Sequence, residues 1–264
     1  MVGGLVRLAT RILPRPLLHR VGVMAGWCMA QCMRGSRYED PIDGFGYRSL
    51  LPYGRVTKRA NALAPHSLSL ERHRMLWLYL TRELRIEQAQ QLRVLHMAPE
   101  WALLRRLRRM KGLRYTTADL SSPWASVHCD IQELPFDDAS FDLILCNHVL
   151  EHIPDDRQAM RELYRVLAPG GTALLLVPLD TTRSTTLEDP SINTPALREQ
   201  FYWQRDHLRL YGLDYPARLM DAGFAVEVVD YAAMLGLEAC QRHAIRTDEP
   251  LYIGRKSEED RNAV

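Results

Sequence analysis

The sequence predicts an α/β protein built on a doubly wound, mostly parallel sheet. Between residues 92 and 177, short apolar runs alternate with segments of helical periodicity, and this alternation is typical of parallel sheets whose strands are joined by helices. The run at residues 143–146 is apolar throughout, as a strand buried on both faces requires. Polar residues follow several of these runs directly, and open α/β sheets bind ligands at the carboxyl ends of their strands.

The expected elements follow the chain in order. Ser69 and the leucines that follow it at helical spacing predict a helix over about residues 69–87. Residues 101–110 predict another helix, because leucines lie on one side of it and arginines on the other. Strands are expected at residues 92–97, 114–118, 127–129, 143–146 and 172–177.

The second half of the chain continues the pattern. A helix is expected to begin at Asp155 or Asp156 and to end at Gly170 and Gly171, since glycine is common just past a helix end. Two further strands are expected at residues 225–229 and 251–255, with a weaker helical stretch between them.

The N-terminal segment is basic and amphipathic. Residues 1–37 contain six arginines and no acid, with apolar residues at roughly helical spacing. No apolar run reaches the roughly 18–20 residues that a spanning helix needs, and a signal peptide is not expected because Arg and Pro interrupt the apolar part. Two interpretations stay open: an arm packed on the domain, or a helix resting on an anionic membrane surface.

Composition narrows the class of protein. Hydrophobic residues make up 47% and charged residues 25%, as in ordinary globular proteins, and a net charge of +2 gives no reason to expect a nucleic-acid partner. The five cysteines are odd in number and form no Cys-x-x-Cys pair, so we expect free thiols in a reducing compartment. We therefore expect a cytoplasmic protein. Peripheral membrane contact through residues 1–37 stays open.

Acidic and polar residues follow the predicted strands at positions that suit a nucleotide. Asp119 follows the second strand, where an acid holds ribose hydroxyls in nucleotide-binding sheets. Asp130 follows the third strand, where an acid can accept a hydrogen bond from an adenine amine. Asn147 and His148 follow the fourth strand. Each acid alone is a weak signal, but together they indicate a nucleotide-like cofactor.

With these motifs in place, residues 91–178 resemble a class I S-adenosylmethionine-dependent methyltransferase of the branch that mostly methylates small molecules. The resemblance lies in Val94–His96, Tyr115–Leu120, Asp130–Phe136, Phe141–Ile144, Val149–Ile153 and Leu167–Gly171. It implies a seven-stranded sheet that ends in an antiparallel hairpin, which suits the two late strands. It also implies S-adenosylmethionine as the cofactor, with contacts from His96, Met97, Ala98, Pro99, Glu100, Asp119, Leu120, Asp130, Ile131, Asn147 and His148.

The first loop departs from the family pattern. The usual acid and glycines are replaced by His96, Ala98, Glu100 and Ala102, although glycine there lets the backbone approach the cofactor closely. Either the cofactor has been lost, or the loop has been rebuilt. The surviving Asp119 and the other strand-end residues favour a rebuilt loop, and the segment resembles a variant found in bacterial methyltransferases. In that variant, Glu100 would meet the amino group of the cofactor's methionine part.

A second departure lies upstream. Related chains often carry a zinc ribbon before a helix that begins like residues 69–74, but Asp40, Asp43, Ala64 and Ser67 stand at its cysteine positions here. Because tetrahedral zinc needs four suitable ligands, no structural zinc is expected. The predicted domains are therefore residues 1–68, a basic arm with a degenerate zinc-ribbon lobe, and residues 69–264, the methyltransferase domain.

Three histidines are candidate catalytic groups. His148 and His152 match the spacing of an inverted zinc-peptidase motif, but the preceding strand is wrong for a peptidase helix. Two histidines also suit Mg²⁺ poorly, so no metal is predicted. Histidine titrates near neutral pH and can act as a general base, which makes His148 the first candidate, followed by His152 and His207. His207, Arg209 and Tyr211 are expected on the substrate side, or else in a solvated loop with one anchoring aromatic residue.

Three functions remain open from the sequence. The first is methyl transfer to an oxygen of a small molecule, or less readily to nitrogen or carbon, with a histidine as base. The second is binding on a methyltransferase fold without catalysis. The third is other chemistry near the bound sulfonium, such as decarboxylation or rearrangement.

Overall fold

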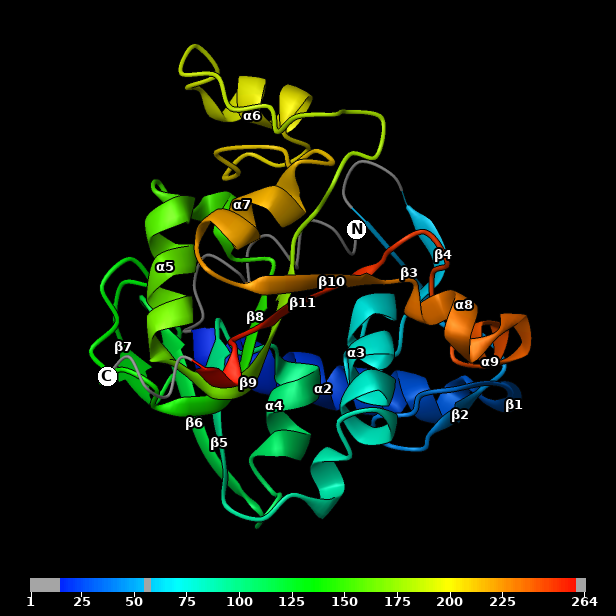
Figure 1. The fold of residues 1–264 in the computed structure, drawn as a ribbon. Helices are drawn as coiled ribbons and strands as arrows, with labels where there is room; N and C mark the ends of the chain where they lie inside the picture. The colour runs from blue at the N-terminus through cyan, green and yellow to red at the C-terminus, as the bar shows by residue number, and fades with distance from the viewer. Residues whose placement is uncertain (1–14, 55–57, 260–264) are drawn as a thin grey trace. The chain divides into compact units, whose positions relative to one another are not determined.

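The chain folds into two compact units that interleave along the sequence. The computed structural model describes residues 15–54 and 58–259 (Figure 1). The N-terminal unit contains the described residues up to Ile86, together with Glu100–Arg106 and Tyr231–Glu249. The sheet unit contains Glu87–Pro99, Leu107–Asp230 and the described residues from Pro250 onward. The single boundary that the sequence predicts, at residue 68, stays a prediction.

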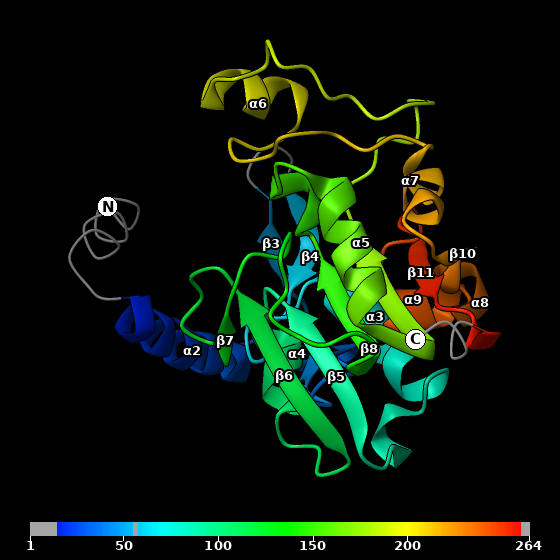
Figure 2. The same cartoon turned by 60° about the vertical axis from the view of Figure 1, so that its left-hand side comes forward.

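The sheet unit is built on seven strands in the order β10-β11-β9-β8-β5-β6-β7. The strands are β5 (Leu92–Met97), β6 (Leu113–Asp119), β7 (Val127–His128), β8 (Phe141–Asn147), β9 (Leu167–Leu176), β10 (Ala225–Val229) and β11 (Leu251–Arg255). β5 to β9 run parallel, whereas β11 is antiparallel to both of its neighbours. The predicted doubly wound, mostly parallel seven-stranded sheet is confirmed. Figure 2 shows β5, β6 and β8 side by side.

Helices and short turns connect these strands. They are η2 (Leu150–His152), α5 (Asp156–Val166), α6 (Pro195–Phe201) and α7 (Tyr215–Asp221). α5 begins as predicted, because the Asp155 carboxylate caps it by accepting a 2.9 Å hydrogen bond from the backbone N–H of Gln158. Its apolar face shares the core with the sheet, through Ala159, Met160, Leu163 and Val166 on the helix and Ile144, Cys146 and Leu175 on the strands.

The expected end of that helix is wrong. α5 stops at Val166, and β9 starts at Leu167, so both glycines lie inside the strand. The register between β8 and β9 shifts between Phe141 and Leu143, which leaves the glycines in an irregular stretch. Gly170 has a φ of +77°, and a Cβ on Gly171 would come within 2.7 Å of the Ala168 carbonyl oxygen. The glycines therefore allow the irregular backbone of β9 and do not end α5.

The N-terminal unit combines helices with two small antiparallel strand pairs, β1 with β2 and β3 with β4. Its elements are α2 (Arg15–Cys32), β1 (Arg34–Glu39), β2 (Gly46–Tyr47), β3 (Leu51–Tyr53), β4 (Arg59–Leu63), α3 (Glu71–Arg82), α4 (Trp101–Leu107, all but its last residue), α8 (Tyr231–Leu235) and α9 (Leu237–Arg242), and the 3-10 turn η1 (Ile86–Gln88) follows α3. α3 and α4 are shorter than predicted. Residues 1–14 of the predicted basic arm lie outside the described residues.

A buried polar network occupies the degenerate zinc-ribbon region. Asp40 is 1% exposed and accepts hydrogen bonds from the Ser67 hydroxyl, the Ser69 hydroxyl at 2.8 Å and the backbone N–H of Ile42 at 2.9 Å. Arg74, fully buried, donates to the Ser69 hydroxyl at 3.1 Å and to the backbone carbonyls of Ser69, Ala62, His243 and Ala244. Hydrogen bonds hold this part of the lobe together.

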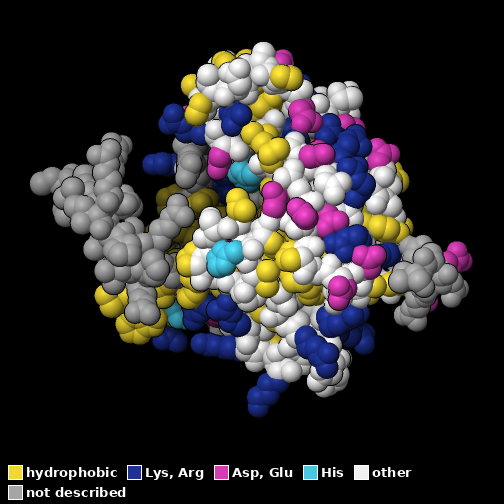
Figure 3. All heavy atoms as spheres, turned by 90° about the vertical axis from the view of Figure 1, so that its left-hand side faces the viewer, with side chains coloured by type: hydrophobic (Ala, Val, Ile, Leu, Met, Phe, Trp, Pro, Cys, Tyr) yellow, Lys and Arg dark blue, Asp and Glu magenta, His cyan; other side chains and the backbone are white. Residues whose placement is uncertain are grey.

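The state of the cysteines and the distribution of surface charge agree with what the composition predicts. All five cysteines are free, as predicted. In the part of the chain that the structure describes, no helix has the length and apolar character that crossing a membrane requires. On the face drawn in Figure 3, basic and acidic side chains are interspersed, in keeping with the small net charge of +2.

Candidate active site

Four parallel strands of the sheet unit bring their carboxyl ends to one edge. β8, β5, β6 and β7 are neighbours in the sheet and run in the same direction. The segments that follow them lie along this edge, where open α/β sheets bind ligands. This edge of the sheet carries nearly all the residues that the sequence predicts to contact a cofactor.

The loop after β5 adopts a conformation that glycine favours, although it contains no glycine. Ala98 has a φ of +45°, and its backbone N–H donates a 2.8 Å hydrogen bond to the Ala118 carbonyl on β6. An alanine in this left-handed region costs about 1 kcal/mol relative to ordinary backbone. Met97 is buried in the core, and Pro99 is also buried. The His96 ring points to the neighbouring strand, with Nδ1 2.7 Å from the Tyr115 hydroxyl.

The second strand end presents an acid beside an exposed apolar side chain. Asp119 Oδ1 accepts hydrogen bonds from the backbone N–H groups of Ser121 and Ser122 at 2.7 and 2.6 Å, which fixes the carboxylate. Its Oδ2 accepts no hydrogen bond from the described residues, so it is available for a ligand hydroxyl. Leu120 is 73% exposed, and a large exposed leucine beside a fixed acid offers a flat apolar surface to a base.

The third strand end carries the other predicted acid. Asp130 is exposed, and the backbone and side-chain nitrogens of Gln132 hold its carboxylate at 2.8 to 3.1 Å. Ile131 is 3% exposed and belongs to the core. Asp130 therefore faces solvent in a fixed position, whereas the Ile131 side chain anchors the segment.

His148 leaves the fourth strand in a strained conformation. Asn147 is buried at the end of β8, and His148 has a φ of +54°. The backbone N–H of His148 donates a 2.7 Å hydrogen bond to the Leu176 carbonyl, which holds it at the sheet edge. Non-glycine residues in this region are uncommon and cluster at functional sites. The His148 Nδ1 lies 3.4 Å from the Glu151 carboxylate.

Glu151 is a buried carboxylate surrounded by histidines. Its side chain is 1% exposed, with His148 on one side and His207 Nε2 4.0 Å from Oε1 on the other. Burial by itself would raise the pKa of Glu151, but the nearby His148, together with the charge of His152, outweighs it and lowers this pKa. Glu151 is thus ionised at neutral pH.

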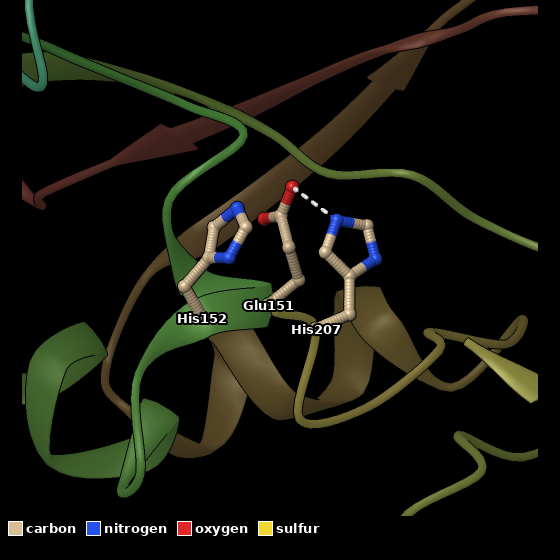
Figure 4. A group of neighbouring side chains, drawn as sticks. All are labelled: Glu151, His152 and His207. Atoms are coloured by element: carbon tan, nitrogen blue, oxygen red, sulfur yellow. Dashed lines mark ion pairs between the residues drawn. The ribbon is translucent and has the colours of Figure 1, made fainter. Parts of the chain in front are cut away.

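His152 and His207 flank Glu151 (Figure 4). The two rings meet edge to face, with centroids 4.8 Å apart. His207 is 1% exposed, and burial lowers its pKa, partly offset by the Glu151 charge. The backbone N–H of Leu208 donates a 2.8 Å hydrogen bond to the Glu151 carbonyl, so the segment that carries His207 is tied to η2. The three predicted catalytic histidines are therefore neighbours of one carboxylate, Glu151, which was not among the predicted site residues.

Arg209 and Tyr211 are framework residues in this structure. Arg209 is 1% exposed and donates to the carbonyls of Leu150, Ile153 and Pro154 and to the Glu188 carboxylate. Tyr211 is fully buried and donates a 2.7 Å hydrogen bond to Asp156. The alternative of a solvated loop is wrong here, and contact of either residue with a substrate stays a prediction.

Glu100 belongs to the N-terminal unit. Its Oε1 lies 3.2 Å from His73 Nε2 and 3.9 Å from Arg72 Nε. This carboxylate already faces two basic side chains within its own unit. Its predicted contact with the amino group of a cofactor stays a prediction.

Comparison with known proteins places residues 92–175 within a family described as a methyltransferase domain. This segment is a class I methyltransferase domain. A demethylmenaquinone methyltransferase of Staphylococcus epidermidis is 44% identical over 59 residues, which are 22% of this chain and 23% of that protein. A ubiquinone/menaquinone biosynthesis C-methyltransferase of Idiomarina loihiensis is 30% identical over 121 residues, which are 42% of this chain and 48% of that protein. The matched region thus spans less than half the length of either relative.

Among solved structures, that of the 4+2 cyclase SpnF has a TM-score of 0.50 at 16% identity and covers 90% of this chain and 96% of that one. This likeness concerns the fold. The predicted class I methyltransferase fold and the predicted family resemblance are both confirmed.

The residues of the methyltransferase domain fit S-adenosylmethionine, the cofactor that this family uses. Ala98 provides a left-handed turn with only a methyl side chain, which leaves room for close approach. Asp119 and Asp130 present fixed carboxylates from neighbouring strands, and Leu120 adds an exposed apolar surface. These residues would hold the ribose, the adenine amine and the adenine face.

Proposed function

We propose that this chain is an S-adenosylmethionine-dependent methyltransferase that methylates an oxygen of a small molecule, with His148 as the general base. The observation that carries the proposal is the position of His148. It lies at the strand-end edge that also carries Asp119 and Asp130, and a buried carboxylate faces its ring.

The proposed chemistry uses His148 and Glu151 together. S-adenosylmethionine, when bound, would supply an electrophilic methyl group, with S-adenosylhomocysteine leaving as the methyl–sulfur bond breaks. His148 accepts the proton of the acceptor hydroxyl as the oxygen attacks, and the imidazolium that forms faces the ionised Glu151 at 3.4 Å. A carboxylate beside the ring stabilises its protonated form and fixes its orientation. Holding the acceptor in line with the methyl group supplies the rest of the rate.

A second candidate is methylation at a ring carbon of a quinol. The relatives from Staphylococcus epidermidis and Idiomarina loihiensis are named as methyltransferases of menaquinone or ubiquinone biosynthesis. Removal of a hydroxyl proton by His148 would also make a quinol ring carbon nucleophilic, so the same side chains suit this reaction. The two candidates differ in which atom receives the methyl group.

The exposed face of α2 supports peripheral membrane contact, which would suit an apolar acceptor. Its large exposed apolar side chains are Val21, Met24, Trp27 and Met29, at 47%, 64%, 52% and 42% exposure. The arginines among residues 1–37 add attraction to anionic lipid. The protein should co-sediment with anionic vesicles, and the double variant Met24→Ser, Trp27→Ser should do so much less.

The decisive experiment offers the protein methyl-labelled S-adenosylmethionine with hydroxylated aromatics, including a demethylmenaquinol. Label on oxygen supports the first candidate, and label on a ring carbon supports the second. His148→Gln should lower kcat by about 100- to 10,000-fold. His128→Gln, an exposed histidine whose Nε2 lies 3.0 Å from the Ser122 carbonyl oxygen, is the matched control. Full turnover by His148→Gln would contradict the role of the base.

A further inference from the structure

Three electron-pair donors meet inside the sheet unit, at Glu151, His152 and His207. One ligand atom from each residue lies within 4.8 Å of the others. Glu151 and His207 are 1% exposed, and the His152 side chain is 33% exposed, so the group is buried but reachable from one side. Figure 4 shows the two rings on either side of the carboxylate.

Backbone carbonyls fix the hydrogen on both rings. His152 Nδ1 lies 3.1 Å from the Asp206 carbonyl oxygen, and His207 Nδ1 lies 2.8 Å from the Tyr202 carbonyl oxygen. A carbonyl oxygen only accepts, so each Nδ1 carries the hydrogen, and each Nε2 of the neutral ring keeps a lone pair. His207 Nε2 is buried without a hydrogen-bond partner among the described residues.

The carboxylate between the rings also lacks donors. Neither oxygen of Glu151 accepts a hydrogen bond in proper geometry from the described residues. The nearest basic nitrogens are His148 Nδ1 at 3.4 Å and His207 Nε2 at 4.0 Å from Oε1. Burial and the missing donors oppose the charged carboxylate, whereas positive charge beside it favours that form. A cation at the centre would satisfy all three groups at once.

We propose that Glu151, His152 and His207 bind a divalent transition-metal ion, for which the donor set favours zinc. Two imidazole nitrogens and one carboxylate oxygen form a ligand set that zinc enzymes use, with a fourth position left open. Mg²⁺ and Ca²⁺ prefer oxygen ligands throughout and fit this set poorly. Hydrogen bonds from Nδ1 to backbone carbonyls are the usual support for histidines that ligate a metal through Nε2.

The geometry needs only a modest contraction. Zinc bonds of about 2.0–2.1 Å to nitrogen and oxygen place tetrahedral ligands about 3.3 Å apart. The donor atoms lie within 4.8 Å of one another, a difference that side-chain rotation can close. The backbone of the site is already tied together by the 2.8 Å hydrogen bond from Leu208 N–H to the Glu151 carbonyl.

This inference goes beyond the proposed function and stands without it, because metal binding requires neither cofactor nor acceptor. In the sequence, only His152 of the three ligands belonged to the histidine pair that we weighed as metal ligands. In the structure, the residues that lie close enough to share a metal ion are His152, Glu151 and His207, without His148. His148 remains beside the site, with Nδ1 3.4 Å from the Glu151 carboxylate.

The test is a calorimetric titration of the whole protein with zinc after treatment with a chelator. We expect one zinc ion per chain with micromolar or tighter affinity. Cobalt at the same site should give the visible absorption of a four-coordinate ion. Glu151→Gln and His152→Gln should each weaken zinc binding by at least about 10-fold. Thermal unfolding of each variant checks that it is folded, and the partly exposed His152 is the substitution that disturbs packing least.

The control is His128→Gln, which removes an exposed histidine elsewhere in the sheet unit and should leave zinc affinity unchanged. Absence of zinc binding at millimolar concentration would overturn the proposal. Equal zinc affinity in the wild type, Glu151→Gln and His152→Gln would overturn it too. A protein that binds zinc but transfers no methyl group would contradict the proposed function and leave the metal site standing.

Discussion

Two buried carboxylates of this molecule have opposite surroundings. Asp40 in the N-terminal unit and Glu151 in the sheet unit are both 1% exposed. Asp40 accepts hydrogen bonds from two hydroxyls and a backbone N–H. Glu151 accepts none in proper geometry from the described residues, and histidines surround it.

The difference separates a structural group from a functional one. A carboxylate whose oxygens are satisfied by its own chain holds a fold together and has little left to offer a ligand. A buried carboxylate that is left unsatisfied is costly unless something else binds it. The three predictions below test this contrast, beginning with the largest expected effect.

Removing Arg74 should destabilise the N-terminal unit severely. Arg74→Met removes the positive charge that favours the ionised form of the buried Asp40 and leaves carbonyl oxygens such as those of Ala62 and His243 without their donor. We expect a loss of about 3–5 kcal/mol in the free energy of unfolding, measured by urea titration. Arg242→Gln, which removes an exposed ion pair with Glu39, is the control and should change little. Similar losses in both variants would mean that burial of Arg74 is not what matters.

The same carboxylate-to-amide change should have different effects at the two sites. Asp40→Asn replaces an acceptor by a donor opposite the Ser67 and Ser69 hydroxyls and should cost about 1–3 kcal/mol. Glu151→Gln breaks no hydrogen bond of proper geometry and should cost less than about 1 kcal/mol in the presence of a chelator. Urea unfolding near neutral pH measures both. A larger loss of stability in Glu151→Gln than in Asp40→Asn would contradict the proposed difference between the two carboxylates.

The smallest expected effect is in the pH dependence of stability. The neighbouring histidines lower the pKa of Glu151 despite its burial, so its contribution is present above pH about 4.3 and is lost as the pH falls through the lowered pKa. Burial and the nearby Asp43 raise the pKa of Asp40, so its ionisation opposes folding as the pH rises from about 3.9 through the raised pKa.

The stability advantage of the wild type over Glu151→Gln should therefore grow as the pH rises from the lowered pKa of Glu151 to about 4.3, and should stay level above it. Its advantage over Asp40→Asn should shrink as the pH rises above about 3.9. Unfolding titrations at several pH values check both slopes. Parallel slopes for the two variants would show that the two carboxylates do not differ in this way.

Several strands were predictable because they are short runs with many apolar residues. β5, β10 and β11 have the predicted bounds. β5 and β11 are buried along most of their length, whereas the edge strand β10 is largely exposed. The end of α5 was not predictable in the same way. In the sequence, Gly170 and Gly171 suggest the end of a helix. In the structure they lie in β9, where the register of its pairing with β8 shifts.

The candidate site was only partly predictable. Asp119, Asp130 and His148 follow strands directly, so strand prediction places them at one edge. The cluster around Glu151 depends on His207, which lies in a distant segment that tertiary hydrogen bonds bring back to η2. Burial of Arg209 and Tyr211 could not be foreseen either, because their partners Glu188 and Asp156 are brought close only by folding.

The most direct test of the account is a calorimetric titration of the whole protein with S-adenosylhomocysteine. We predict one site per chain, with affinity weakened by at least about 10-fold in Asp119→Ala because a ribose hydroxyl loses its charged acceptor. Glu227→Gln, on the edge strand β10 away from the strand ends, should bind like the wild type. Absence of binding at millimolar concentration, or unchanged affinity in Asp119→Ala, would contradict the account.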